Sequence, residues 1–353
     1  MKRFYTILGV ALFLGNAGAF AEQATLIDFS KLVGEGDAGL HAQTTIDYSR
    51  QAGSSYSAED KTKMKVSLAI QSWEIQLSSS SQTVENQSQS MVSAAPVKAD
   101  ASKYAGQTVM GVRVHFPSYG INSFAVVKPP FAIPAYQTLE GAKDAKPGSQ
   151  FDGFGVLKNV GVLKSIQINV LGRNFSNSLS LLLENQFGEE QEIFMGYLNF
   201  DGWKALNWVN PNYQTEVRNR DIRVLALYPR SAPFIKLKGI VIHRDAAQDG
   251  GDIVTYFKDI NVIYDQAVIP GGSEVDDEAI WGILKQKEEN QRNTELAKLG
   301  NLQVLRTLEN QKMGKRRIIE VKKTTFGIRG SAGKWEFYVI DQQYRAPTSY
   351  RPE

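Results

Sequence analysis

The residues that could do chemistry in this sequence are few and widely spaced. The histidines are His41, His115 and His243, and none stands at the H-x-x-x-H, H-E-x-x-H or H-x-H spacing of a metal site. The chain has no cysteine, which excludes thiol nucleophiles, cysteine metal sites and disulfides. No G-x-S-x-G or G-x-x-x-x-G-K-[ST] motif occurs. The sequence therefore predicts no enzyme, cofactor or metal, although paired glycosidase carboxylates would leave no mark in it.

Two polar patterns have a functional and an ordinary interpretation. Gly34, Gly36 and Gly39 form G-x-G-x-x-G, but the polar residues after them do not predict the helix that a dinucleotide site needs, so a glycine-rich loop is favoured. Four acids surround a Gly-Gly pair: Asp245, Asp249, Asp252 and Asp259. Calcium would use such oxygen ligands, yet the EF-hand spacing is absent, which favours a hairpin loop.

Three aromatic residues could form a platform that stacks on sugars, namely Trp203, Trp208 and Tyr213. Aromatic residues in strands more often fill a sandwich core, because each buries a large apolar area. The sequence favours the core interpretation.

The elements that must position these residues are mostly strands. Apolar residues alternate with polar ones at 112–116, 166–170, 179–183 and 193–197, which predicts strands with one buried face. The segment 201–265 continues with four short β-rich runs, GWKALNWVNPNY, DIRVLALYP, FIKLKGIVIHRD and GGDIVTYFKDINVIYD, with no helix expected between them. About seven strands suffice for an antiparallel β-sandwich of jelly-roll type.

Two details of these strands are also predicted. Lys238-Gly239 in the middle of a strand indicates a β-bulge. The prolines within 124–136 indicate an edge strand or a loop, because proline cannot donate to a sheet ladder.

The N-terminus has the pattern of an export signal. Lys2 and Arg3 precede a short apolar run, and Ala19-Phe20-Ala21 matches an A-x-A cleavage site, so cleavage is expected between Ala21 and Glu22. Removal of residues 1–21 leaves 38 basic residues against 37 acidic ones, which gives no general attraction to nucleic acid or anionic lipid. Without a second apolar span, no membrane insertion is expected and the product is placed in a periplasm.

The composition changes after residue 270, and we expect a β-sandwich domain at 22–270 and a separate arm at 271–353. Residues 276–313 are rich in helix formers, and strand-like runs follow at 318–328 and 334–343. The arm has a leucine series and a basic cluster, and both are candidates for an assembly surface: Leu296, Leu299, Leu302, Leu305 and Leu308, then Lys315, Arg316 and Arg317.

Several long segments together resemble one family. LIDFSKL, GWKALNWVNPNYQ, LALYPRSAPFIKLKGIVIHRD and DIVTYFKDINVIYDQA are similar to the flagellar filament outer layer (FlaA sheath) proteins of spirochaetes, over roughly residues 22–267 and into the arm. The resemblance implies a non-enzymatic protein of the periplasmic flagellum. Its implied partners are FlaB-type core flagellins and other copies or paralogues of the sheath protein. It implies no catalytic residues.

A second hypothesis comes from another class of protein. The sandwich pattern and the aromatic residues also suit an exported carbohydrate-binding protein, or an accessory subunit of a glycan-processing system. A continuous aromatic groove would favour this hypothesis, and flat mixed patches would favour filament coating.

Overall fold

The computed structural model describes residues 21–118, 122–139, 148–223, 226, 228–246, 248–267, 274–324, 328–329 and 335–336, with side chains of the last long helix described as far as Met313. The chain forms two compact units. The first comprises residues 1–47 and 65–299, and the second comprises 48–64 and 300–353.

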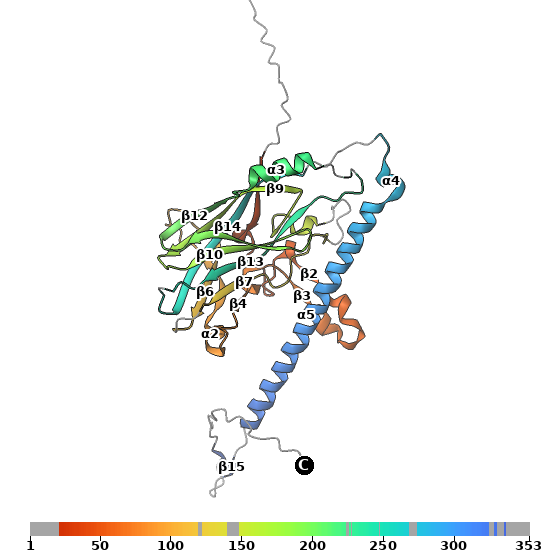
Figure 1. Cartoon of the computed structure of the whole chain (residues 1–353). Helices are drawn as coiled ribbons and strands as arrows, with labels where there is room; N and C mark the ends of the chain where they lie inside the picture. Colours follow the sequence, from red (N-terminus) through yellow and green to blue (C-terminus); the bar gives the residue numbers. More distant parts are fainter. Residues whose placement is uncertain are drawn as a thin grey trace, which may run out of the picture. The chain divides into compact units, whose positions relative to one another are not determined.

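The first unit contains two six-stranded antiparallel sheets (Figure 1). One has the order β12-β9-β14-β6-β5, and β1 pairs with the part of β14 that lies beyond β6. Its strands are β1 (Ala21–Asp28), β5 (Met91–Pro96), β6 (Thr108–Phe116), β9 (Val160–Arg173), β12 (Asp201–Val209) and β14 (Gly251–Gln266). The longest contact in the sheet is between β9 and β14, at its centre.

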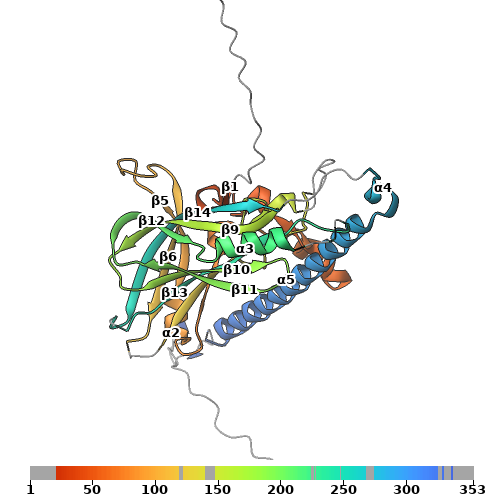
Figure 2. The ribbon, with the colours of Figure 1, turned by 45° about the horizontal axis from the view of Figure 1, so that its top comes forward.

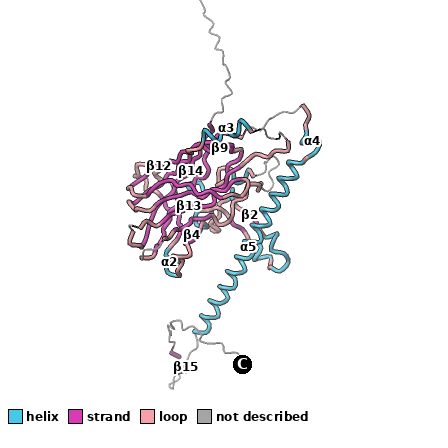
Figure 3. The backbone as a smooth tube through the Cα atoms, viewed as in Figure 1, coloured by secondary structure: helices cyan, strands magenta, loops and turns pink. Residues whose placement is uncertain are grey.

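The other sheet has the order β11-β10-β13-β7-β4, with β8 pairing alongside β13. Its strands are β4 (Glu74–Leu77), β7 (Phe124–Lys128), β8 (Val156–Lys158), β10 (Ser178–Asn185), β11 (Glu190–Tyr197) and β13 (Phe234–His243). Figure 3 shows the strands of both sheets together in magenta. Alternate residues of β9 are buried, including Ile166, Ile168 and Val170. The fold is thus the expected jelly-roll-like antiparallel sandwich with a helical arm.

The bulge expected at Lys238-Gly239 is confirmed. Leu182 pairs with Gly239 and Leu183 with Leu237, so the register skips Lys238. A Cβ on Gly239 would lie 2.9 Å from Val126 Cγ1, which leaves room only for glycine beside β7.

The strand expected from DIRVLALYP is wrong. Residues 213–222 form helix α3 (Tyr213–Ile222), which lies against β9 (Figure 2), and the described residues after it are not in a strand. One local and one long-range hydrogen bond hold this helix, because Asn210 donates to Glu216 and the Tyr213 hydroxyl donates to Asp265 of β14 at 2.8 Å. Alternation in the sequence did not reveal these contacts.

The edge expected at 124–136 is also wrong in part. Strand β7 ends at Lys128, just before the prolines, and it pairs on one side with β13 and on the other with β4. Strand β7 is therefore not an edge strand. The prolines, which cannot donate to a sheet ladder, lie in the loop that follows it.

The arm begins with α4 (Asp277–Trp281) and continues as α5 (Ile283–Thr324). The strand expected from residue 318 is wrong as far as Thr324, because the helix extends through it; short strands β15 (Ile328–Arg329) and β16 (Trp335–Glu336) follow. Strong helix formers in 314–324 outweigh the few β-branched residues. No described helix has the length and apolar character needed to cross a membrane.

The second unit joins residues 48–64 to the later part of α5. Tyr48 Oη lies 3.1 Å from Thr307 Oγ1, and a Cβ on Gly300 would lie 2.4 Å from Gln51 Cγ. This segment includes α1 (Ala58–Thr62). The close approach of Gln51 to the helix at Gly300 explains why a glycine is suited to the middle of α5. In the first unit, β2 (Ile46–Asp47) pairs with β3 (Lys65–Val66), and α2 (Val84–Gln89) precedes β5.

Candidate functional site

The three histidines lie in separate places. His41 is buried with Nδ1 3.0 Å from Thr44 Oγ1, and burial lowers its pKa. His115 Nδ1 lies 2.8 Å from an Asp252 carboxylate oxygen, and His243 Nε2 lies 2.7 Å from Glu192. The described residues include no group of three or more histidines and acids that could hold a metal ion.

The other polar patterns also separate in the fold. Asp252 pairs with Arg113 at 2.6 Å, whereas Asp259 accepts from Asn169 and Asn261. The glycine motif forms a loop closed by a bridge between Glu35 and Leu40, as favoured above. These contacts give Asp252, Asp259 and the glycine loop structural roles.

The three aromatic residues do not form one platform. Trp203 and Trp208 are five positions apart on β12 and so face opposite sides of the sheet. Trp203 packs edge-on against Tyr104, with ring centroids 4.8 Å apart. Tyr213 is held on α3 by its bond to Asp265, and Trp208 lines a pocket at one end of the sandwich.

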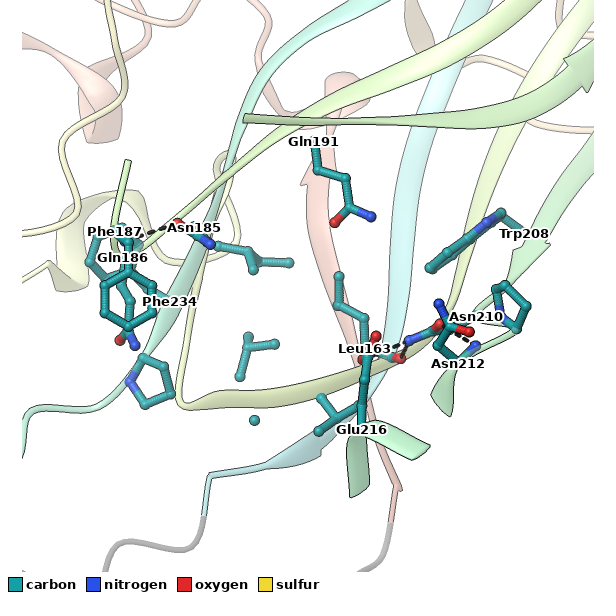
Figure 4. Close-up of a pocket in the computed structure, with 16 residues that line it drawn as sticks. Leu163, Asn185, Gln186, Phe187, Gln191, Trp208, Asn210, Asn212, Glu216 and Phe234 are labelled. Carbon is teal, nitrogen blue, oxygen red and sulfur yellow. Dashed lines mark hydrogen bonds between the residues drawn. The ribbon is translucent and has the colours of Figure 1, made fainter. Parts of the chain in front are cut away.

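That pocket, of about 490 Å³, lies at one end of the sandwich between the two sheets. Its floor is the end of the buried core and includes Val160, Val162 and Ile235. Figure 4 shows the Gln191 and Trp208 side chains extending into the space between Phe187 and Phe234 on one side and Asn210 and Asn212 on the other.

The strand register explains why these side chains point inward. Ile193 and Met195 of β11 are buried, and Gln191 continues the same face; Leu206 of β12 is buried, and Trp208 continues that face. A sandwich that only filled its core would place an apolar residue at position 191. An inward-facing glutamine at the open end therefore marks the pocket, although alternation in the sequence did not predict a pocket there.

Hydrogen bonds hold the rim in place. Asn210 is buried and its Nδ2 donates to Leu163 O at 2.8 Å and to Glu216 at 3.0 Å. On the opposite side, Asn185 Oδ1 accepts from the backbone N–H of Phe187 at 2.9 Å, which fixes the hairpin turn that carries the phenylalanine. The pocket is thus shaped by bonded residues rather than by free loops.

A second hollow of about 410 Å³ adjoins the first and shares residues with it, including Gln186 and Glu216. Three arginines line it, Arg220, Arg223 and Arg230. Arg220 donates to Gln266 O at 3.3 Å, and its Nε lies 3.9 Å from Asp221. The shared wall makes one continuous groove with an aromatic, amide-rich half and a basic half.

The leucines proposed as an assembly surface do not form one face. A helix turns about 100° per residue, so each leucine three positions further on is displaced by about 60° around the helix axis. Two leucines that are nine positions apart therefore lie on opposite sides of the helix. Leu299 is accordingly 5% exposed, whereas Leu302 and Leu305 are 45% and 58% exposed. Leu296 is half-buried. Lys315, Arg316 and Arg317 lie within α5, but their side chains are outside the described part.

The polar part of the arm makes contacts that the sequence did not predict. Glu295 Oε2 accepts from the Tyr136 backbone N–H at 3.0 Å, and Oε1 lies 3.6 Å from Lys236 of β13. Lys236 also pairs with Glu184 at 3.3 Å. Burial, together with the nearby charges of Glu295 and Glu288, raises the pKa of Tyr136 to about 12. The arm is thus joined to the sandwich by charge, where apolar periodicity gave no signal.

Ala21 and Glu22, the expected cleavage residues, stand at the start of β1, where they pair with Asp265 and Tyr264. Residues 1–20, the body of the expected signal peptide, lie outside the described residues. The cleavage point remains a prediction.

The fold and the groove together define a β-sandwich protein with a groove at one end and a helical arm. The sequence profile of the family described as "Flagellar filament outer layer protein Flaa" matches residues 37–271. The flagellar filament outer layer protein of Spirochaeta aurantia is 75% identical over 317 residues, which cover 89% of this chain and 94% of that protein. The protein of the same name from Treponema pallidum (strain Nichols) is 40% identical over 89% of this chain and 95% of its own length. The chain belongs to the flagellar filament outer layer protein family.

Similarity to solved structures is much weaker. The module TmCBM61, solved with β-1,4-galactotriose, aligns with a TM-score of 0.26 and 8% identity over 55% of this chain and 88% of that one. Values this low carry no argument about ligand.

Proposed function

We propose that this protein is a structural component of the outer layer of the periplasmic flagellar filament and surrounds a core of FlaB-type flagellin. Its family and the names of two relatives, 75% and 40% identical to it, support the outer-layer role. In this proposal the protein is not an enzyme, and it contributes to filament stiffness and so to cell motility.

The observation that carries the proposal is the exposed apolar surface on two edge strands. β11 and β12 end their sheets on the same side and are consecutive in the chain. On β11, the rings of Phe194 and Tyr197 form an edge-on pair 5.4 Å apart, and both are half exposed. Val209 at the end of β12 is 67% exposed. Free strand edges with large apolar side chains are typical of contact surfaces between proteins.

The remaining parts of the proposal follow from the sequence. Export would remove residues 1–21 between Ala21 and Glu22 and deliver the chain to the periplasm. Residues 22–270 would act as the sandwich domain and 271–353 as the arm. In the arm, Leu302 and Leu305 are the leucines exposed enough to contact another subunit, either a copy of this chain or a paralogue.

Isolation of the flagella tests the proposal. Periplasmic flagella are purified and their proteins are quantified by mass spectrometry; the chain is expected in a fixed ratio to flagellin. A Phe194→Ser/Tyr197→Ser variant is expected to stay folded and to be depleted from the filament. Gln214→Ser on α3, which is exposed and lies on neither edge strand, serves as the matched control. Absence of the wild-type chain from purified flagella would refute the outer-layer role.

A further inference from the structure

We propose that the groove at the end of the sandwich binds a saccharide that carries a carboxylate. The aromatic, amide-rich half would hold the sugar rings, and the arginine-lined half would hold the acid group. This inference is independent of the filament role, because it rests on the groove alone. The pocket of about 490 Å³ lies within the range of roughly 300–1,000 Å³ that is usual for small-molecule sites.

Trp208 supplies the stacking surface. It continues the inward face of β12 beyond buried Leu206, but it lines the pocket and remains partly exposed. A tryptophan used only for core packing would be covered by the opposite sheet, where Gln191 stands instead. The C–H face of a sugar ring is apolar and flat enough to lie against an indole, while its hydroxyls remain free for polar partners.

The amides supply those polar partners. Within the described part of the chain, the side-chain amides of Gln186 and Gln191 have no hydrogen-bond partner, and both line the pocket. Each amide can donate and accept at once, which matches a sugar hydroxyl that also does both. Glu216 adds an acceptor whose position is fixed by its bond from Asn210 at 3.0 Å.

The arginines account for the acid group. Arg220 uses part of its guanidinium on Gln266 O, whereas for Arg223 and Arg230 the described residues offer no partner. Planar guanidinium groups bind carboxylates through paired, charge-assisted hydrogen bonds. Because Gln186 and Glu216 line both hollows, a carboxylate among the arginines and a sugar ring on Trp208 can belong to one ligand.

The same groove fits an acidic peptide less well. Extended peptides are usually held by main-chain hydrogen bonds along a free strand edge. Here the lining groups include side chains that point inward from the strands, such as Gln191 and Trp208, rather than the edges themselves. The favoured ligand is therefore a saccharide.

Calorimetric titration of the purified protein tests the inference with three probes of similar size: a hyaluronan tetrasaccharide, neutral chitotetraose and tetraglutamate. The hyaluronan probe alternates glucuronate with N-acetylglucosamine and is expected to bind most tightly. Trp208→Ala is expected to weaken its binding by about tenfold, which corresponds to about 1.4 kcal/mol and lies within the contribution of one aromatic contact. Trp203→Ala, on the opposite face of the same strand, is the matched control and is expected to leave binding unchanged.

The arginine half is tested separately. Arg223→Gln/Arg230→Gln is expected to remove the preference for hyaluronan over chitotetraose, and Arg218→Gln, an exposed arginine of α3 outside the lining, is expected to keep it. Thermal unfolding checks that each variant is folded. Failure of both saccharides to bind, equal loss in the two tryptophan variants, or tighter binding of tetraglutamate would each overturn the inference. None of these outcomes bears on co-purification with flagella, so the two proposals fail separately.

Discussion

At the scale of single residues, the buried lysine Lys258 depends on nearby carboxylates to remain charged. Its side chain is 8% exposed, and Nζ lies 2.7 Å from Asp28 and 3.3 Å from Asp259. Two strands, β1 and β14, contribute these charges. A buried cation needs such partners because removal from water disfavours the charged form.

Replacing this lysine tests its role. Lys258→Met keeps the length of the side chain but leaves two carboxylates without their cation. We expect the free energy of unfolding to fall by about 3–5 kcal/mol, as for other broken buried ion pairs. Urea unfolding followed by circular dichroism measures the change. Lys103→Met, at an exposed lysine, is the control, and an equal effect of both variants would contradict the assignment.

The same group predicts a pH dependence. Burial raises the pKa of Asp28, but hydrogen bonds from Lys258 and Ser30 outweigh it, so the pKa in the folded state lies below its usual 3.8. The unfolded state then binds the proton more readily. The resulting stability is present above the usual pKa and is lost as the pH falls through the folded pKa. Asp28→Asn should therefore show a shallower loss of stability below pH 3.8 than the wild type, by urea unfolding at each pH.

At the scale of elements, the first half of α5 is joined to the sandwich through Glu295. Glu295→Ala removes both the acceptor for the Tyr136 N–H and a partner of Lys236. We expect faster amide hydrogen exchange in residues 283–299 while the strands keep their protection. Glu289→Ala on the same helix, at an exposed position, is the control. Unchanged exchange in 283–299 would show that other contacts hold the helix.

The leucines of α5 separate packing from assembly. Leu299→Ala is expected to destabilise the protein by about 2–5 kcal/mol because the side chain is buried. Leu302→Asp/Leu305→Asp changes two exposed positions, so unfolding should shift by less than about 1 kcal/mol while incorporation into filaments falls. Quantitative mass spectrometry of isolated flagella measures incorporation. Wild-type incorporation of the double variant would remove this stretch of α5 from the assembly surface.

Sequence patterns predicted the strands that bury one face and expose the other. Alternation located β9, β10 and β11 correctly, and Lys238-Gly239 predicted the bulge in β13. Alternation failed at α3, where the hydrogen bond from Asn210 to Glu216 of the helix and the bond from Tyr213 to Asp265 of β14 decide the structure. Alternation could not predict the groove for the same reason, because the residues that line the groove come from separate strands and α3. Of these lining residues, only Trp208 had been considered as a sugar-binding residue.

At the scale of the whole molecule, the sandwich ends in two edge strands, β11 and β12, on one side and has a groove at one end. The edge strands suit lateral contacts in a protein layer, because their unpaired backbone groups and exposed aromatic residues stay available. The groove is lined by other side chains of the same two strands, Gln191 of β11 and Trp208 of β12. A layer subunit that also binds a saccharide therefore needs no shared residues for the two roles.

The diameter of isolated flagellar filaments, measured by cryo-electron microscopy with and without the gene for this protein, tests whether the chain builds the outer layer. We predict that filaments of the deletion strain keep their flagellin core but are thinner or lack density along part of the outer layer. Re-expression of the wild-type chain should restore that density. Filaments of unchanged diameter and outer density in the deletion strain, with the paralogue content also unchanged, would contradict the claim that this chain builds the outer layer.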